Sequence, residues 1–273
     1  MVTKIFNLKT TDFLFEHSIL RDEKEVLRMA HSHNAYEIIF FLRGDATYII
    51  EDRKYDLKKN DIVFIRPGKY HYIQLNSSAE YERYNMLFTS RILNLNLKKL
   101  IPNEVEVLNC SDNVIQQNFK KLNSYYSQFD EASFFDITKC LLKEILYNVS
   151  IYGKDSSSPS IVSPLISQAL EYIQTNLFTI ESITEISQQL FITETYLFKL
   201  FKSQLKLSPH KYIIEKRLLK AEKLIRSGSK PTEVYSACGF KNYSTFYKRY
   251  VEFFGFSPSD TNQNYILKSS PFD

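Results

Sequence analysis

This sequence has no long apolar run, and its first residues do not resemble a secretory signal peptide. No stretch approaches the roughly 18 consecutive apolar residues of a transmembrane helix, so we expect no membrane partner. The first nine residues, from Met1 to Lys9, lack the apolar core of a secretory signal peptide. The sequence therefore predicts a cytoplasmic protein.

Cysteine is scarce, and the three cysteines are not arranged in pairs. Cys110, Cys140 and Cys238 are far apart, odd in number and without CxxC spacing. This pattern argues against a disulfide framework and against a structural zinc site. Disorder is not expected either, because 44% of the residues are hydrophobic and 24% are charged. A chain of 273 residues is long enough for two domains.

The excess positive charge is confined to the C-terminal part of the chain. Residues 1–159 contain 21 basic and 21 acidic residues, whereas residues 160–273 contain 14 basic and 10 acidic ones. Between Thr195 and Val251 there are 13 basic residues and only three acidic ones. A polyanion such as double-stranded DNA is the natural partner of this segment.

Short apolar or alternating runs separated by turn residues predict β-strands in the first third of the chain. Clear examples lie at residues 36–42, 47–50 and 61–65, and Arg43-Gly44-Asp45 forms one of the turns between them. Many short strands at this spacing predict a small barrel or sandwich over about residues 1–90.

Helical periodicity replaces the strand pattern near residue 87. Apolar positions recur at helical spacing in residues 112–128 and 132–151, which predicts two helices within about 111–152. These helices could cover the barrel or form the contact with a partner subunit. A serine-rich stretch then ends the pattern, and we place a linker at 153–163 after a first domain of residues 1–155.

Beyond the linker the sequence shows helical patterns only, including two copies of one short pattern that lie 48 residues apart. The copies span 182–201 and 230–250, and each predicts a helix-turn-helix. Helix starts are marked by the capping box Ser182-x-x-Glu185 and by Ser208-Pro209. A long helix over residues 208–226 would join the two copies.

The second helix of each copy has a buried stripe and an outward stripe. In the first copy the spacing buries Leu197, Leu200 and Phe201, and the outward set is Thr195, Phe198, Lys199 and Lys202. In the second copy it buries Phe246, Tyr250 and the aliphatic stem of Arg249, and the outward set is Tyr243, Ser244, Tyr247 and Lys248.

The outward groups suit a DNA duplex. Lysine binds guanine acceptors or phosphates, hydroxyl groups reach base edges or phosphates, and aromatic rings contact thymine methyls. Two other interpretations stay open, because Phe198 could turn into the core and the lysines could form a solvated helix face.

Residues 165–262 resemble the DNA-binding domain of the AraC/XylS family of bacterial transcription regulators. The matching positions are Tyr196-Leu197, Leu200-Phe201-Lys202, Leu207-Ser208-Pro209, Tyr212-Ile213, Arg217-Leu218, Lys220-Ala221, Leu224-Ile225, Glu233-Val234, Gly239-Phe240, Phe246, Phe254-Gly255 and Ser257-Pro258. The resemblance implies that the joining helix holds both helix-turn-helix units rigidly, so that their recognition helices enter successive major grooves about 34 Å apart. We place this domain at 164–262 and a tail at 263–273.

The same resemblance implies partners and an unequal pair of DNA-reading units. It implies a homodimer that contacts itself through the helices at 112–151, and an activator that works with RNA polymerase. The second unit departs from the family pattern at Pro231, Tyr235, Thr245, Lys248 and Val251. Because Lys248 stands where the family has arginine, which can bind bidentately, we expect the second unit mainly to contact phosphates.

Three of the five histidines fall in one small region of the strand-rich part. They follow the pattern His31-x-His33-x3-Glu37-x6-Gly44, and His71 comes just after Pro67-Gly68. This resembles the cupin pattern, in which three histidines and one glutamate converge on a metal inside a barrel. The N-terminal half also resembles the cupin-like ligand-binding domain of sugar-responsive members of the same family. The implied fold is mixed, with a cupin-like β-barrel and its own C-terminal helices before an all-α domain.

We expect an effector pocket formed by His31, His33, Tyr36, Glu37, Tyr48 and His71. With Tyr72 nearby, the aromatic faces would suit a sugar ring. The histidines and glutamate could instead bind a metal ion, with His31, His33, Glu37 and His71 as ligands, or they could be structural. No cofactor is required by the sequence.

Together these features predict a transcription regulator rather than an enzyme. It would bind double-stranded DNA as an activator under the control of a small-molecule effector, with a sugar as the first candidate. Two alternatives remain: a cupin metal-dependent enzyme fused to a DNA-targeting module, and a regulator that responds to a fatty acid or another apolar effector.

Overall fold

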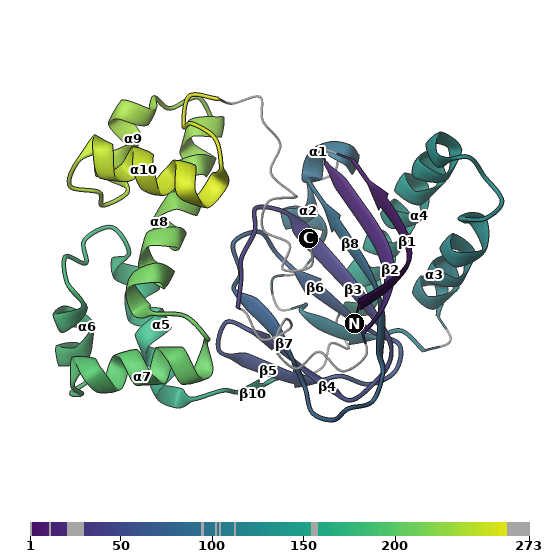
Figure 1. Ribbon diagram of the computed structural model, residues 1–273, viewed down its shortest axis with the longest axis horizontal. Helices are drawn as coiled ribbons and strands as arrows, with labels where there is room; N and C mark the ends of the chain where they lie inside the picture. The colour runs from purple at the N-terminus through teal and green to yellow at the C-terminus, as the bar shows by residue number, and fades with distance from the viewer. Residues whose placement is uncertain are drawn as a thin grey trace. The chain divides into compact units, whose positions relative to one another are not determined.

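The computed structural model describes residues 2–10, 12–20, 30–93, 96–101, 103, 105–111, 113–153 and 158–260. The chain forms two compact units (Figure 1). The first lies within residues 1–160 apart from residues 51–53, and the second comprises residues 51–53 and the described residues from 161 onward. The first unit is built on antiparallel β-sheet and the second is helical, so the predicted fold class is confirmed. Residues 154–157 of the expected linker and the whole expected tail, 263–273, lie outside the described residues.

Two antiparallel sheets form the first unit. The larger has the strand order β1 (Val2–Lys9), β2 (Phe13–Leu20), β8 (Tyr81–Phe88), β3 (Tyr36–Arg43), β6 (Asp61–Ile65) and β9 (Val107–Asn109). The smaller has the order β10 (Ser160–Ile161), β5 (Arg53–Asp56), β4 (Ala46–Ile50) and β7 (His71–Leu75). Side chains from both sheets share one apolar cluster, which includes Ile39, Phe41, Ile50, Val63 and Ile73, so the sheets enclose a common interior.

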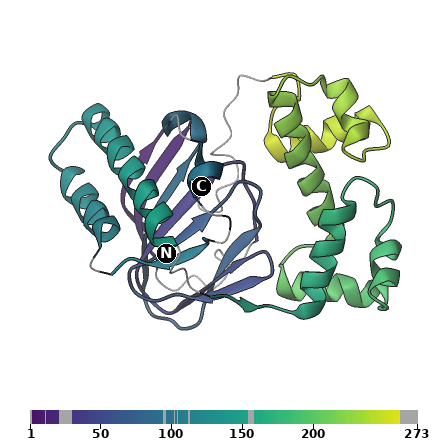
Figure 2. The same cartoon turned by 180° about the vertical axis from the view of Figure 1, so that it is seen from behind.

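The opposite face of the larger sheet is covered by helices (Figures 1 and 2). Because strand residues alternate between faces, Ile38 and Phe40 pack on this side while Ile39 and Phe41 face the interior. Helices α3 (Val114–Tyr125) and α4 (Glu131–Tyr152) supply the covering side chains, and the rings of Phe40 and Phe119 stack at 4.5 Å. Two one-turn helices, α1 (Ser90–Leu93) and α2 (Leu97–Leu100), precede them.

Both covering helices begin at side chains that accept hydrogen bonds from the first turn. The Asn113 oxygen accepts from the Ile115 and Gln116 amides, and the Asp130 carboxylate accepts from Ser133. The first of the two predicted helices is shorter than expected, because it ends at Tyr125 rather than at residue 128.

The described residues of the second unit form six helices. In chain order they are α5 (Pro164–Asn176), α6 (Ile183–Gln189), α7 (Glu194–Gln204), α8 (Pro209–Arg226), α9 (Pro231–Ala237) and α10 (Tyr243–Phe254). The predicted signals start several of them: the Ser182 amide donates to the Glu185 carboxylate at 2.9 Å, and Ser208 with Pro209 opens α8. Helix pairs α6–α7 and α9–α10 are the two predicted helix-turn-helix units, and α8 joins them.

Arg217, on α8, ties the two helix-turn-helix units together. Its guanidinium donates to the carbonyls of Leu177 at 2.7 Å and Ile180 at 2.6 Å, which lie before α6, and to that of Gly239 at 2.8 Å, in the α9–α10 turn. Gly239 has φ +79°, and a Cβ there would lie 2.7 Å from the Phe178 carbonyl oxygen. The turn therefore needs glycine for both its backbone conformation and its close packing.

Within the part of the chain that the structure describes, no helix is long and apolar enough to span a membrane.

Candidate functional site

Helix α7 is the second helix of the first helix-turn-helix unit. It starts at Thr193, whose hydroxyl oxygen accepts from the Tyr196 amide at 3.2 Å. Leu197, Leu200 and Phe201 are buried, as the apolar spacing predicts, and this fixes which side of the helix faces solvent.

The solvent side of α7 carries most of the predicted outward set. Thr195, Lys199 and Lys202 are exposed. Phe198 is only half-buried, with its ring 5.8 Å from that of His210, so it is neither a core residue nor a fully projecting one. Tyr196 is half-exposed as well and is a further candidate contact residue that the sequence pattern did not predict. Its position beside Thr195, next to the buried stripe, is the signal that could have identified it.

Helix α10 is the corresponding helix of the second unit. It starts at Asn242, whose side-chain oxygen accepts from the Thr245 amide at 2.8 Å. Phe246 and Tyr250 are buried, as predicted. The expected burial of the Arg249 stem is wrong, because Arg249 is exposed and its guanidinium lies 3.0 Å from the carboxylate of Glu252, one turn along.

The outward set of α10 divides into two kinds. Ser244, Tyr247 and Lys248 are exposed, whereas Tyr243 is half-buried and its ring contacts those of Tyr235 and Phe246. Tyr243 therefore supports the packing between α9 and α10, with only part of its ring accessible to a ligand.

The surface of the second unit is more positive than its sequence suggests. Ten basic side chains between Thr195 and Val251 are exposed, namely Lys199, Lys202, Lys206, Lys211, Lys220, Lys223, Lys230, Lys241, Lys248 and Arg249. Of the three acidic residues in that segment, Glu215 and Glu222 are buried, and only Glu233 is exposed. Glu222 accepts hydrogen bonds from Tyr250 and Arg226, so its charge is used internally. The remaining exposed charge suits a phosphate backbone.

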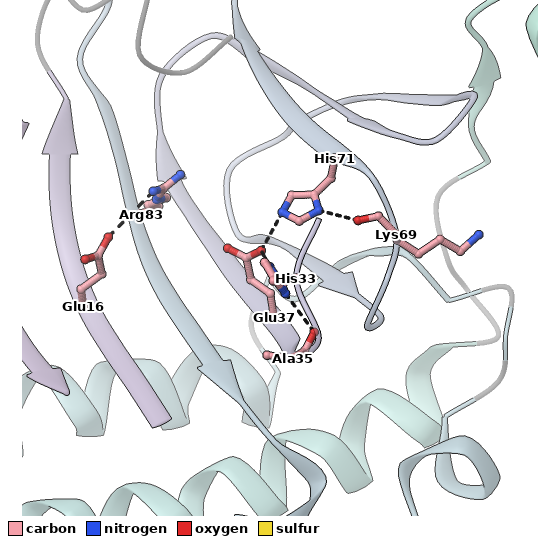
Figure 3. Close-up of polar contacts among 7 residues, drawn as sticks. All are labelled: Glu16, His33, Ala35, Glu37, Lys69, His71 and Arg83. Carbon is pink, nitrogen blue, oxygen red and sulfur yellow. Dashed lines mark hydrogen bonds and ion pairs between the residues drawn. The ribbon is translucent and has the colours of Figure 1, made fainter. Parts of the chain in front are cut away.

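The first unit brings the predicted histidines and glutamate together. His33 and His71 each place Nε2 at 3.0 Å from the same oxygen of Glu37, as Figure 3 shows. His31 joins them through a two-way backbone pairing with His71, and one ligand atom from each of the four residues lies within 4.8 Å of all the others. Burial raises the pKa of the Glu37 carboxyl, but hydrogen bonds with His33 and His71 outweigh burial and hold that pKa well below its usual range.

Two of the tyrosines expected near this cluster point away from it. Tyr36 and Tyr72 each adjoin a cluster member on the same strand, and successive side chains on a strand point to opposite faces. The Tyr36 ring accordingly packs on Phe64 and Phe88, on the side of the sheet that faces the helices. The placement of Tyr36 in the effector pocket is therefore wrong.

Tyr48 lies beside the histidine cluster. Its buried ring stacks on His71 at 6.1 Å. Burial and the nearby Glu37 charge raise the pKa of Tyr48 well above its ordinary value, so its hydroxyl is neutral near pH 7.

A second polar group inside the sheets was not found from the sequence. Arg83, on β8, is 2% exposed, and its guanidinium lies 3.8 Å from the Glu16 carboxylate (Figure 3). The guanidinium also lies over the ring of Tyr81. Across the β2–β8 pairing, Ser18 lies opposite Arg83 and Asn85 lies opposite Glu16. The Ser18 hydroxyl and the Asn85 side-chain oxygen are buried and have no hydrogen-bond partner among the described residues. These four polar residues face the same interior as Glu37.

The arrangement matches two families of domains. A model of the AraC-like ligand binding domain matches residues 16–132, and a model of a helix-turn-helix domain matches residues 186–264. Together the two models span most of both units, in the order expected from the fold.

Relatives that match over most of the chain are also regulators. The probable transcriptional regulator LumQ of Photobacterium leiognathi is 25% identical over 84% of this chain and 90% of its own length. The lactose operon transcription activator of Staphylococcus xylosus is 22% identical over 83% of each chain. A crystal structure of apo ToxT from Vibrio cholerae aligns with 92% of this chain and 97% of its own, with 14% identity and a TM-score of 0.42. The domains and relatives are those of transcription regulators, not of enzymes.

Proposed function

The chain belongs to the AraC family of transcription regulators, and from that premise we propose that it is an activator controlled by a polar small molecule. In this proposal the effector binds inside the first unit, and the second unit binds promoter DNA through α7 and α10. The protein acts in the cytoplasm as a homodimer that works with RNA polymerase.

The exposed basic surface of the second unit is the observation that carries the DNA-binding part. Lys199 and Lys202 share the solvent side of α7 with Thr195 and the half-buried Phe198, so charge, hydroxyl and aromatic groups lie on one helix face. This is the mixture that reads base edges and phosphates in a major groove. On α10, Lys248 and Ser244 offer phosphate contacts, with Tyr247 beside them.

The buried polar groups of the first unit support a polar effector. Arg83 and Glu16 are buried charged groups in this interior, and the Ser18 and Asn85 oxygens there have no hydrogen-bond partner among the described residues. Burying a polar group without a partner costs free energy, and a ligand with several hydroxyl groups would supply partners. A sugar fits this chemistry, and the name of the lactose operon relative is consistent with it.

The same interior includes a large apolar cluster, which leaves a fatty acid as the competing effector. A thermal-shift screen of the full chain with sugars and fatty acids separates the two. Stabilisation by a sugar that is lost in Arg83→Ala and Asn85→Ala supports the polar effector, whereas stabilisation only by fatty acids would overturn it.

DNA binding itself is tested by fluorescence anisotropy of the full chain with labelled promoter duplexes at several salt concentrations. We expect tight binding that weakens steeply as salt rises, because each neutralised phosphate releases counterions. Absence of binding even at low salt would contradict the proposed function. Repeating the titration with the effector found in the screen tests whether the two sites are coupled.

A further inference from the structure

The cluster of His31, His33, Glu37 and His71 has a hydrogen-bond arrangement that a pocket lining does not require. Nδ1 of His33 lies 3.1 Å from the Ala35 carbonyl oxygen, and Nδ1 of His71 lies 2.9 Å from that of Lys69. A carbonyl oxygen can only accept, so each Nδ1 carries a proton. In a neutral ring, Nε2 then presents a lone pair.

Both Nε2 atoms point at the same carboxylate oxygen. Nε2 of His33 and Nε2 of His71 lie 3.0 Å from the same oxygen of Glu37 (Figure 3). Acceptor atoms can lie this close only if protons or a metal cation lie between them, and one divalent ion would bind all three atoms at once. A backbone carbonyl on Nδ1 is also the arrangement that fixes the ring of a metal-binding histidine and exposes its Nε2.

From this geometry we propose that His31, His33, Glu37 and His71 bind one divalent transition-metal ion. The proposal goes beyond the proposed function, because DNA reading and effector binding require no metal.

The four ligands are held by backbone structure before any ion arrives. His31 and His71 exchange backbone hydrogen bonds of 3.0 and 3.2 Å, and Glu37 lies on β3 in the centre of the larger sheet. The ring centroids of the three histidines are 4.2 to 5.9 Å apart, and one ligand atom from each residue lies within 4.8 Å of all the others. An ion with bonds of about 2.0–2.1 Å separates its ligands by about 3–4 Å, so small side-chain movements suffice.

The ligand types select the class of ion. Three imidazole nitrogens and one carboxylate oxygen suit Zn²⁺, Fe²⁺, Ni²⁺ or Cu²⁺, whereas Ca²⁺ and Mg²⁺ prefer oxygen ligands throughout. Bound there, the ion would connect the segment around residues 31–33 with β3 and β7, and so stabilise the first unit.

The chain contains a matched control histidine. His17 is also buried in the sheet and also places Nε2 close to a glutamate, at 2.8 Å from Glu82. Its Nδ1, however, has no hydrogen-bond partner among the described residues, and His17 is not a member of the four-residue cluster. It shares the burial and the carboxylate of the proposed ligands but lacks their arrangement.

The test uses the full chain without a histidine tag, freed of metal by a chelator, loaded with Zn²⁺ and passed through gel filtration before elemental analysis. We expect one Zn²⁺ per chain in the wild type and in His17→Ala. His71→Ala and the near-isosteric Glu37→Gln should bind Zn²⁺ at least about 10-fold more weakly. Loading with Co²⁺ should give visible absorption bands in the first two proteins only, and Zn²⁺ should raise the melting temperature of the first two only.

Circular dichroism measures whether each variant is folded. If His71→Ala does not fold, the Zn²⁺ content of Glu37→Gln decides the outcome. Sub-stoichiometric Zn²⁺ in the wild type, or equal retention by Glu37→Gln and His17→Ala, would overturn the proposal. The second result would mean that the histidines are protonated and simply pair with the carboxylate. DNA binding measured on the same metal-free samples reports on the proposed function separately.

Discussion

At the scale of single residues, two glycines of the second unit distinguish backbone strain from crowding. Gly239 and Gly228 both have positive φ, +79° and +102°, which disfavours any side chain. A Cβ at Gly239 would meet the Phe178 carbonyl at 2.7 Å and the Arg217 guanidinium at 2.9 Å, whereas a Cβ at Gly228 would meet nothing within 4 Å.

We therefore expect Gly239→Ala to destabilise the second unit more than Gly228→Ala. The backbone strain common to both costs about 1–2 kcal/mol. Only Gly239→Ala also pushes the Arg217 side chain away from the carbonyls that it binds. Urea denaturation followed by circular dichroism measures the difference, and equal unfolding free energies would show that the close contacts relax without cost.

Residues on the solvent side of α7 should fall into two groups, those that contact base edges and those that contact phosphates. We expect Lys202→Ala to weaken binding to all duplexes similarly. It should also reduce the slope of log affinity against log salt concentration by about one. Lys199→Ala and Phe198→Ala should instead change the ranking of duplex sequences. Anisotropy titrations against a panel of single-base-pair variants distinguish these effects, and similar losses for all three variants would show that the readout residues are misassigned.

The three cysteines should differ in reactivity because of where they lie. Burial raises the pKa of the Cys110 thiol to about 12 and also raises that of Cys238, whereas Cys140 is exposed on α4. Since only a thiolate reacts, a thiol-specific reagent at pH 8 should modify one cysteine in the native chain and three after unfolding. The buried thiols favour the folded state below their unfolded pKa, and this stabilisation is lost as pH rises toward their raised folded values. Rapid modification of two or more cysteines in the native chain would contradict this assignment.

At the scale of elements, α4 carries an apolar surface that its packing does not use. Tyr147 and Ile151 are one turn apart and are 50% and 64% exposed, while Leu142, Ile145, Leu146 and Val149 pack on the sheet side. A second copy of the chain that packed against α4 would cover these exposed apolar side chains. This fits the expected dimer contact over residues 112–151.

We expect Tyr147→Glu and Ile151→Glu to shift the protein from dimer to monomer, because each places an uncompensated charge in an apolar contact. Ala132→Glu is the matched control, since it adds the same charge to an exposed position in the first turn of α4. Light scattering coupled to gel filtration measures the mass. Dimers in all three variants would place the dimer contact elsewhere.

Local signals account for the elements that the sequence predicted well. Helix starts at Ser182, Ser208 and Asn242 depend on side chains that bond within the next three residues, so they can be read from the chain directly. Strand alternation likewise assigns Glu37 to one face. The same rule places Tyr36, the neighbour of Glu37 on β3, on the opposite face and so outside the pocket.

Long-range pairing accounts for the features that the sequence could not supply. Arg83 meets Glu16 and Ser18 only because β2 pairs with β8, in a register set by residues more than 60 positions apart. The Arg217 contacts depend in the same way on the final packing of α8 against two turns. No periodicity within one segment reports such contacts.

At the scale of the whole molecule, the two helix-turn-helix units should contribute unequally to the recognition of DNA sequence. Helix α7 exposes two lysines, Lys199 and Lys202, whereas α10 exposes one, Lys248, and the other exposed cation of α10, Arg249, pairs with Glu252. We expect base-pair changes in the half of the site bound by α7 to cost about 1–3 kcal/mol each. Changes in the half bound by α10 should cost less.

The experiment begins with a duplex selected from a random library by the full chain, which is then changed one base pair at a time. Lys248→Ala should weaken binding to every duplex by a similar factor, as expected for a phosphate contact. Lys248→Arg should add discrimination in the α10 half alone, because a guanidinium can bind guanine bidentately and an ammonium cannot. If both halves of the wild-type site already discriminate equally, the second unit reads sequence as the first does, and the unequal division is wrong.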